Sequence, residues 1–268
     1  MLTATSVQQR NCIKFYGSTG PVLLLAHGFG CNQQMWRFLI PVLSQHYQLV
    51  LFDYVGSGQS DLTAYCPQRY ASLTGYAQDI IDIITVLDLQ DVTLIGHSVS
   101  SMITMLAAAQ LPDRIRNLIM VCPSPCYLND LPVYPGGFDK TDLVELLDLM
   151  DKNYLGWANY LAPLVIGSHD EMFTGELADS FCSTDPVIAK SFAKATFFTD
   201  FRAELSQIRQ PVLLLQSQFD SLAPLAVGQF MQQQIPQAKL VIFAAKGHCL
   251  HMTHPVQVSS AILQFLME

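Results

Sequence analysis

The stretch Val92–Ser100, with the sequence VTLIGHSVS, places one serine between a strand pattern and a helix pattern. Residues up to Ile95 are β-branched or apolar, as in a buried strand, and the run after Ser98 is typical of a helix. A sharp turn between strand and helix exposes the serine hydroxyl, and Gly96 supplies one of the small residues that flank such a turn. Ser100 replaces the second glycine of the common G-x-S-x-G pattern, so we expect a slight backbone shift there.

Similar apolar runs recur along the chain and alternate with helix-like segments. Strands are predicted at Val22–Ala26, Leu49–Asp53, Val92–Ile95, Leu118–Cys122, Val212–Gln216 and Lys239–Phe243. Helices are predicted near Met35–Ser44, Leu73–Leu87, Val99–Gln110, Ala223–Gln233 and Pro255–Leu266. This alternation predicts an α/β fold with a mostly parallel, twisted sheet and helices on both faces. The turn residues 17–21 predict an antiparallel hairpin between Ile13–Tyr16 and Val22–Ala26.

The strand pattern stops between about Tyr127 and Phe197. Helices are predicted there near Lys140–Met150, Asn153–Val165, Glu176–Cys182 and Val187–Ala195. We interpret residues 127–196 as a four-helix lid inserted into a core of residues 1–126 and 197–268. Ligands of open α/β sheets bind at the carboxyl ends of the strands, so the insertion is expected to cover that edge.

A lone serine is a poor nucleophile and needs a base within hydrogen-bond reach, together with an acid that orients the base. Asp220 follows the predicted strand Val212–Gln216, and His248 follows Lys239–Phe243. Each residue taken alone is more often part of an ordinary turn. Their order along the chain, serine, aspartate and histidine, is the order found on this type of sheet. We therefore predict a catalytic triad of Ser98, Asp220 and His248.

Acyl transfer also needs N–H donors for the negative charge that develops on the substrate oxygen. The backbone N–H of Val99 follows the nucleophile, and Phe29 lies in His27–Gly30, a glycine-containing loop after an early strand. We predict that Phe29 and Val99 form the oxyanion hole. The alternative for the loop is a tight turn without a catalytic role.

Two other patterns are weaker. The segment Asp53–Asp61 contains two glycines but lacks the third glycine and the helix of a dinucleotide site, so we interpret it as a turn. His248, His251 and His254 recur at every third residue, but Pro255 disfavours a helix through them and no carboxylate completes a set of metal ligands. We predict no metal and no cofactor.

Apolar and aromatic side chains of the predicted lid are candidates for the wall of a substrate pocket. For any one of them, helix packing is the more common role. The candidates, with one residue beside the nucleophile and one after Asp220, are His97, Phe138, Leu143, Trp157, Tyr160, Phe181, Phe197, Phe198 and Leu222.

Composition narrows the range of partners. Of the 268 residues, 50% are hydrophobic and 13% are charged, and the net charge is -8, so nucleic acid and anionic membranes are disfavoured. The uncharged run 92–112 contains too many polar residues for a membrane span. The seven cysteines are scattered and the first residues do not resemble a secretory signal, so a cytoplasmic location is expected.

With these residues identified, the sequence resembles the RsbQ family of bacterial α/β-hydrolases, which act in stress signalling, and their plant relatives, the strigolactone and karrikin receptors. The resemblance covers nearly the whole chain and rests on HGFGCNQQMW, LFDYVGSGQSD, GYAQDIIDI, GHSVSSM, PSPCYLND, GGF, KNYLGWA, FCSTDPVIAK and KGHCLHMTHP. It implies the same triad and oxyanion donors, a four-helix lid over a hydrophobic pocket, and a partner phosphatase with a PAS domain.

Two functions follow as hypotheses. The first is a serine hydrolase that cleaves a small hydrophobic ester or lactone through an acyl-enzyme, acting in stress signalling. The second is a ligand-binding signalling module in which hydrolysis is slow or incidental and the ligand changes the affinity for the phosphatase. Other reactions occur on this fold, but a serine at position 98 disfavours dehalogenation, which needs a carboxylate nucleophile.

Overall fold

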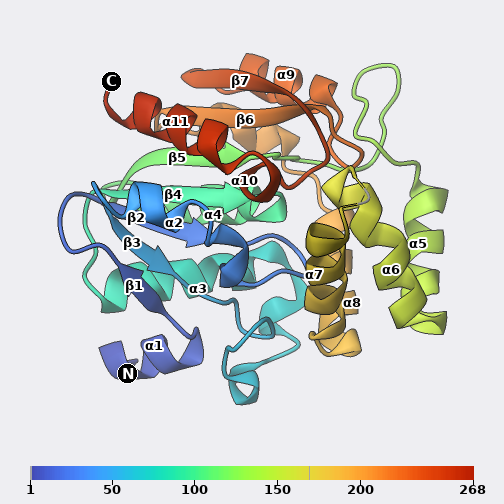
Figure 1. The fold of residues 1–268 in the computed structure, drawn as a ribbon, viewed down its shortest axis with the longest axis horizontal. Helices are drawn as coiled ribbons and strands as arrows, with labels where there is room; N and C mark the ends of the chain where they lie inside the picture. The colour runs from blue at the N-terminus through green and yellow to red at the C-terminus, as the bar shows by residue number, and fades with distance from the viewer. Residues whose placement is uncertain (1, 169) are drawn as a thin grey trace.

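Seven strands form one twisted sheet in the computed structural model, which describes residues 2–168 and 170–268 (Figure 1). The strand order is β1-β3-β2-β4-β5-β6-β7, and every neighbouring pair except β1 and β3 is parallel. The strands are β1 (Lys14–Tyr16), β2 (Val22–Ala26), β3 (Gln48–Leu51), β4 (Val92–His97), β5 (Ile115–Val121), β6 (Val212–Phe219) and β7 (Ala238–Lys246). The predicted fold class, a mostly parallel α/β sheet with helices on both faces, is confirmed.

The predicted hairpin at the N-terminus is wrong. Strand β1 pairs antiparallel with β3, with Lys14 opposite Leu51, and does not pair with β2. Both edges of β2 are occupied, because β3 and β4 flank it as parallel neighbours. Strand β3 is the nearest strand with a free edge, so β1 pairs with it, and residues 17–21 pass the start of β3 to reach β2 and do not close a hairpin.

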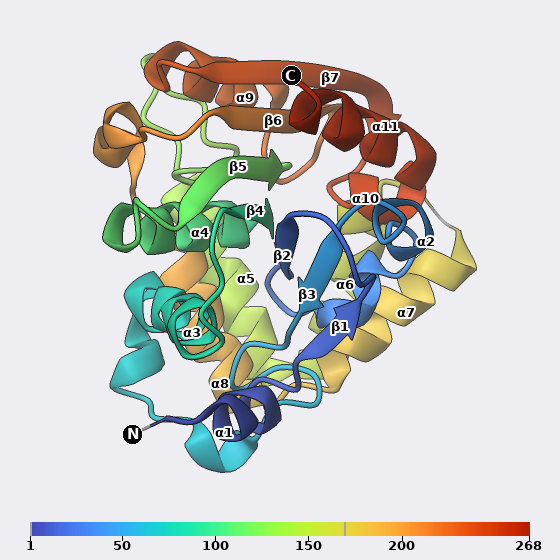
Figure 2. The same cartoon turned by 90° about the vertical axis from the view of Figure 1, so that its left-hand side faces the viewer.

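Alternate residues of the strands point to two hydrophobic layers. Leu23 and Leu25 of β2 belong to the layer that contains α2, α10 and α11, whereas Leu24 belongs to the layer that contains α3, α4 and α9. Figure 2 shows these helices on opposite sides of the strands. The elements around the sheet are α1 (Ala4–Arg10), η1 (Gln33–Trp36), α2 (Ile40–Leu43), η2 (Leu62–Ala64), η3 (Arg69–Ala71), α3 (Leu73–Val86), α4 (Val99–Gln110), η4 (Arg202–Gln207), α9 (Leu225–Gln234), α10 (Leu250–Thr253) and α11 (Pro255–Leu266).

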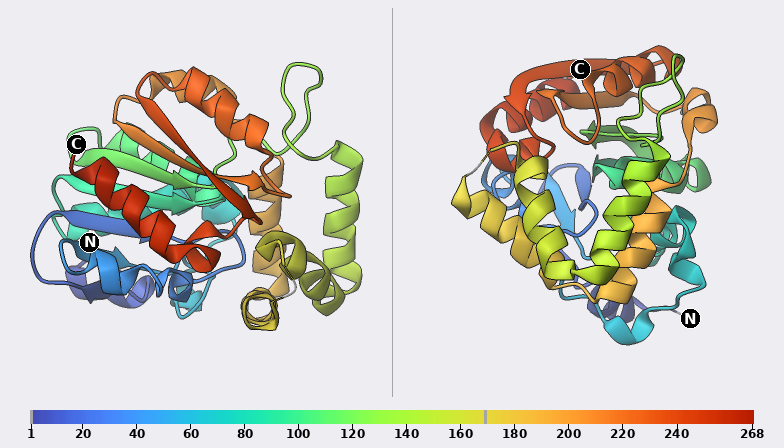
Figure 3. Two further views of the ribbon diagram at one scale, coloured as in Figure 1. Left: turned by 45° about the horizontal axis from the view of Figure 1, so that its top comes forward. Right: turned by 90° about the vertical axis from the view of Figure 1, so that its right-hand side faces the viewer.

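The chain leaves the sheet after β5 and returns at β6, and the four helices between them lie together beyond one end of the strands (Figures 1 and 3). They are α5 (Lys140–Lys152), α6 (Tyr154–Ile166), α7 (Glu171–Cys182) and α8 (Pro186–Phe197). Each begins at an Asp or Asn. The side chains of Asn153, Asp170 and Asp185 accept a hydrogen bond from a backbone N–H of the first turn, whereas at α5 the backbone N–H of Asp139 donates to the Asp142 side chain. We call α5–α8 the helical insertion.

The uncharged run 92–112 is divided between strand β4 and helix α4. Within residues 2–168 and 170–268, no helix combines the length and the apolar character that crossing a bilayer requires. The hydrophobic residues of this run are instead part of the two core layers.

Candidate active site

Ser98 occupies the sharp turn between β4 and α4. Its backbone has φ 57° and ψ −125°, a strained conformation for a residue with a side chain. Gly96 makes the turn possible, because a Cβ atom there would lie 2.4 Å from the carbonyl oxygen of Ser100. The strand before the turn and the helix after it are both buried, and they hold the Ser98 hydroxyl in one place.

Ser98, His248 and Asp220 are joined by two hydrogen bonds. His248 Nε2 lies 2.7 Å from Ser98 Oγ, and His248 Nδ1 lies 2.8 Å from Asp220 Oδ2. Asp220 follows the end of β6 and His248 follows the end of β7, so the parallel sheet brings both residues to the edge where Ser98 lies. All three side chains are buried.

Hydrogen bonds to Oδ1 of Asp220 determine the direction in which its other carboxylate oxygen, Oδ2, points. Asp220 Oδ1 accepts hydrogen bonds from the backbone N–H groups of Leu222 and Ala223, at 2.9 and 3.0 Å. Oδ2 is thereby turned toward His248, whose Nδ1 carries the proton of the neutral ring. Nε2 is then an acceptor that can take the proton of the Ser98 hydroxyl.

The two predicted oxyanion donors lie on either side of the Ser98 turn. Val99 is the first residue of α4, where helix geometry leaves backbone N–H groups without intrahelical partners. Phe29 lies in the loop after β2, and this loop packs against His97, the residue before Ser98, since a Cβ on Gly28 would lie 2.4 Å from His97 Nδ1. The Phe29 ring packs against four aromatic rings of the insertion, which are Trp157, Phe181, Phe192 and Phe197.

A narrow cavity lies over the Ser98 hydroxyl, between the sheet edge and the helical insertion. Its volume is about 30 Å³. Four of the nine residues predicted for the pocket line it: His97, Phe181, Phe197 and Leu222. Its other lining residues are Phe29, Cys31, Ser98, Tyr127, Leu161, Val165, Leu177, Thr196, His248 and Cys249.

The other five residues predicted for the pocket lie elsewhere. Phe138 and Tyr160 line an adjoining groove, which shares Leu161 and Leu222 with the cavity, and Tyr160 is 60% exposed. Leu143 and Trp157 are fully buried in the packing of the insertion, and Phe198 is partly buried against the same core. Helix α6 explains the difference, because Leu161 and Val165 share its inner face and Tyr160 lies on the outer one.

Tyr127 was missed in the sequence, although its hydroxyl lies 3.0 Å from Ser98 Oγ. The Ser98 proton points to His248, so the Tyr127 O–H donates to Ser98 Oγ. Burial raises the pKa of Tyr127, and its hydroxyl therefore stays protonated. The signal for this residue was its position shortly after the end of β5, at the edge where ligands bind.

Two further histidines surround the site in neutral form. His97 Nε2 lies 2.9 Å from the backbone carbonyl of His248 and donates to it. Burial, together with the charge of neighbouring histidines, lowers the pKa of His97 well below its ordinary value and that of His251 to about 3. The His251 ring packs between Trp36 and His97 at centroid distances of 4.5 and 4.4 Å, so it serves as a packed core residue.

Among the described residues, Cys122, Asp220 and His248 form the one group with metal-ligand atoms close together, within 4.8 Å of one another. Asp220 and His248 already bond each other, and burial raises the pKa of the Cys122 thiol well above its ordinary value, which keeps the thiol protonated. This chemistry fits a triad with a neighbouring thiol better than a metal centre.

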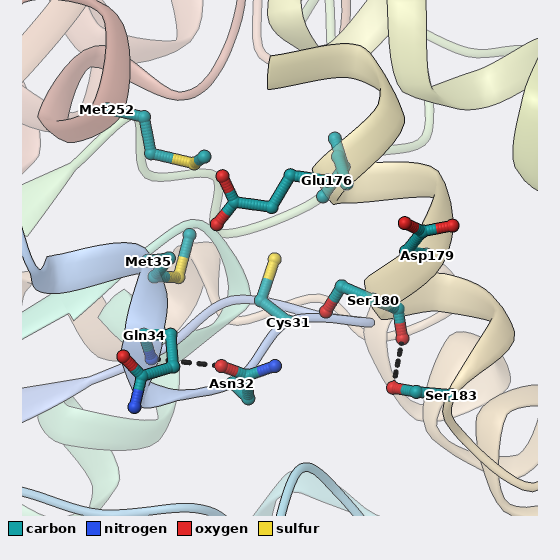
Figure 4. A pocket seen from close by; sticks show the side chains of 10 residues that line it. Cys31, Asn32, Gln34, Met35, Glu176, Asp179, Ser180, Ser183 and Met252 are labelled. Carbon is teal, nitrogen blue, oxygen red and sulfur yellow. Dashed lines mark hydrogen bonds between the residues drawn. The ribbon is translucent and has the colours of Figure 1, made fainter. Parts of the chain in front are cut away.

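A second hollow lies between η1 and α7, beside the loop that carries Phe29 (Figure 4). Cys31 and Leu177 line both this hollow and the inner cavity, so they form the wall between the two. On its rim, the Glu176 carboxylate of α7 accepts two hydrogen bonds from the Arg37 guanidinium of the core. Ser180 of α7 donates to the Gly30 carbonyl at 2.8 Å, a further link between insertion and core.

A mostly parallel sheet with a serine in a strained strand-to-helix turn, followed along the chain by an Asp and a His at later strand ends, defines the α/β-hydrolase class. A model of the alpha/beta hydrolase fold family matches residues 21–255. The chain therefore belongs to the α/β-hydrolase family.

Three proteins are similar to this chain over nearly its whole length. The Karrikin insensitive 2 receptor CA of Petunia hybrida is 34% identical over 262 residues, 97% of each chain. The Strigolactone esterase D14 of Arabidopsis thaliana is 29% identical over 95% of each chain. A hydrolase from Oleispira antarctica has a solved structure that superposes with a TM-score of 0.98, at 51% identity, covering all of this chain and 98% of the other.

Proposed function

We propose that this protein is a serine hydrolase that cleaves a small hydrophobic ester or lactone through an acyl-enzyme. The observation that carries the proposal is the hydrogen-bonded series Ser98–His248–Asp220, whose hydroxyl end opens into an apolar cavity. Tyr127, Thr196 and the histidines are the polar residues beside Ser98 in its lining, and none of the described residues that line it carries a fixed charge. A neutral, apolar substrate suits such a wall.

The reaction proceeds in two halves. Ser98 Oγ attacks the substrate carbonyl carbon while His248 Nε2 takes the hydroxyl proton, and Asp220 stabilises the resulting imidazolium. The N–H groups of Phe29 and Val99 stabilise the oxygen that becomes negative. The imidazolium then protonates the departing alkoxide, and a water molecule, deprotonated by His248, releases the acyl group from Ser98.

Comparison of the wild-type protein with the Ser98→Ala variant tests this proposal. We expect the wild-type protein to hydrolyse p-nitrophenyl acetate or butyrate, and the variant to have a kcat lower by a factor of about 10⁴ or more, as for loss of a nucleophile. Equal unfolding midpoints in urea would show that the variant is folded. Equal hydrolysis rates of the two folded proteins would contradict the proposal.

A second function, an RsbQ-like signalling role, is supported by the receptor among the similar proteins. In this proposal the cavity binds a small hydrophobic ligand, the helical insertion acts as a lid, and its movement changes the affinity for a cytoplasmic phosphatase with a PAS domain. The Arg37–Glu176 and Ser180–Gly30 contacts between insertion and core would have to change for the lid to move.

The two functions differ in what Ser98→Ala does to partner binding. Isothermal titration of a PAS-domain phosphatase into the protein, with and without a short-chain ester, measures the coupling between ligand and partner. Coupling that survives in Ser98→Ala supports the signalling role independently of turnover. No binding of the phosphatase under either condition would argue against it.

A further inference from the structure

The hydroxyl of Ser100 lies in a buried hydrogen-bond network. Ser100 Oγ donates to the backbone carbonyl of His27, at the start of the loop that carries Phe29. The same oxygen lies 2.9 Å from the hydroxyl of Tyr54. Because Ser100 has a single proton and donates it to His27, the Tyr54 O–H is the donor in this second bond. All three side chains are buried, with exposed fractions of 0%.

The His27 ring continues the network to the next peptide group. The backbone N–H of Tyr54 points at His27 Nε2 from 3.2 Å, so Nε2 is an acceptor and Nδ1 carries the proton. Nδ1 then donates to the carbonyl of Gly28 at 2.9 Å. Burial lowers the pKa of His27, which keeps the ring in this neutral form. The Gly28 carbonyl also accepts from the Cys31 N–H.

The orientation of the Gly28 carbonyl determines the direction of the Phe29 N–H. A trans peptide group is planar, and its C=O and N–H bonds point in opposite directions. With the Gly28 carbonyl held by the His27 ring, the Phe29 N–H of the same peptide group is turned the other way. Ser100 holds the backbone of His27, and Tyr54 holds both Ser100 and the His27 ring.

We propose that Ser100 is a positioning residue, which together with Tyr54 aligns the Phe29 N–H for the developing oxyanion. The inference rests on the proposed hydrolase function. It gives the serine that replaces glycine in the G-x-S-x-G pattern a role of its own, because the hydroxyl links the nucleophile helix α4 directly to the oxyanion loop. A glycine at this position could not make either bond.

The test compares hydroxyl-deletion variants in the full-length protein. Loss of a whole oxyanion donor costs about 10²–10³ in kcat, so looser alignment of one donor should cost less. With p-nitrophenyl acetate, we expect Ser100→Ala and Ser100→Gly to lower kcat about tenfold, with KM changed less than twofold. Tyr54→Phe, which keeps the backbone N–H, should lower kcat about threefold. The double variant Tyr54→Phe/Ser100→Ala should resemble Ser100→Ala, since the two hydroxyls act in series.

Thr104→Val is the matched control. Thr104 is a fully buried residue of the same helix whose hydroxyl donates to the carbonyl of Ser101, within α4. Its loss should leave kcat within twofold of the wild-type value. A fall in kcat for Thr104→Val equal to that for Ser100→Ala would show that any buried hydroxyl of α4 has the same effect, and would overturn the inference.

A second measurement separates this inference from the proposed function. The rate at which a fluorophosphonate labels Ser98, followed by intact-protein mass, depends on the oxyanion contacts but not on turnover. Suppose that the wild-type protein hydrolyses esters and Ser98→Ala does not. If Ser100→Ala then has the same kcat and the same labelling rate as the wild-type protein, the inference is overturned and the proposed function stands. If no ester is hydrolysed, slower labelling in Ser100→Ala still supports it. If the wild-type protein is neither active nor labelled, both fail.

Discussion

Asp220 accepts three hydrogen bonds, and together they determine which nitrogen of His248 carries the proton. Oδ1 is engaged by two backbone N–H groups, so an oxygen must stay on that side. Oδ2 is therefore the atom that faces His248 Nδ1. Replacing the carboxylate of Asp220 by an amide should therefore move the His248 proton from Nδ1 to Nε2 without disturbing the loop around Asp220.

We expect Asp220→Asn to lower kcat for p-nitrophenyl acetate by a factor of about 10³–10⁴. The amide oxygen would keep the two backbone donors, and its NH₂ would face Nδ1. His248 would then carry its proton on Nε2 and could not accept from Ser98. Asp91→Asn, a change in an exposed carboxylate paired with Arg116, is the control. A kcat for Asp220→Asn within tenfold of wild type would contradict this account.

At the scale of elements, the last turn of α6 supports the loop that carries His248. The His248 N–H donates to the carbonyl of Val165 at 2.7 Å, and the Gly247 N–H donates to the carbonyl of Phe219 at 3.0 Å. Gly167, which ends α6 with φ 76°, packs its backbone against Gly247, with φ 87°. The insertion thus holds the backbone of the proposed base as well as covering the cavity.

Two glycine-to-alanine substitutions test this contact. In Gly247→Ala the new Cβ would lie 2.0 Å from the Ile166 carbonyl at a positive φ, so we expect a loss of roughly 2–3 kcal/mol in the free energy of unfolding and a kcat lower by about tenfold or more. Gly175→Ala, in α7 with open space around its Cβ, should be stabilising by about 0.5–1 kcal/mol at unchanged kcat. Urea unfolding and ester kinetics measure both. Equal effects of the two changes would refute the role of the contact.

At the scale of the whole molecule, burial of neutral histidines couples folding to pH. His27, His97 and His251 are all fully buried, and burial lowers the pKa of each, that of His251 to about 3. The unfolded chain binds protons at these side chains near the ordinary pKa of about 6.5. Below about pH 6.5 the unfolded state therefore binds more protons at these side chains than the folded state, and the free energy of unfolding falls as the pH falls.

His251, whose pKa in the folded protein is about 3, should contribute a slope of roughly 1.4 kcal/mol per pH unit between pH 6 and 5, because its side chain is mostly protonated there only in the unfolded chain. His27 and His97, whose pKa values burial also lowers, should add to this loss in the same direction. In His251→Phe the slope should be smaller by about 1.4 kcal/mol per unit. Urea titrations at pH 5.0, 5.5, 6.0 and 7.5 measure it. A slope unchanged by His251→Phe would disprove the contribution of this residue.

Strand patterns predicted all six parallel strands. The inner strands gave continuous apolar runs because they are buried on both faces, whereas β7 is a largely exposed edge strand. Pairing of β1 was predicted wrongly, since which edge is free depends on the order of strands in the sheet. The pocket was predicted in part for a similar reason. Leu161 and Tyr160 are neighbours in sequence, and only the packing of α6 decides which of them faces the cavity.

The sequence by itself determined the α/β fold and indicated which serine, aspartate and histidine follow the ends of β4, β6 and β7. Those signals depend only on local periodicity and on the order of residues along the chain. The tertiary structure alone decided that these three side chains bond one another, that Tyr127 reaches Ser98, and that Ser100 bonds the loop that carries Phe29. Such contacts join segments up to 150 residues apart. Their distances depend on sheet order, helix rotation and backbone direction, which no local pattern encodes.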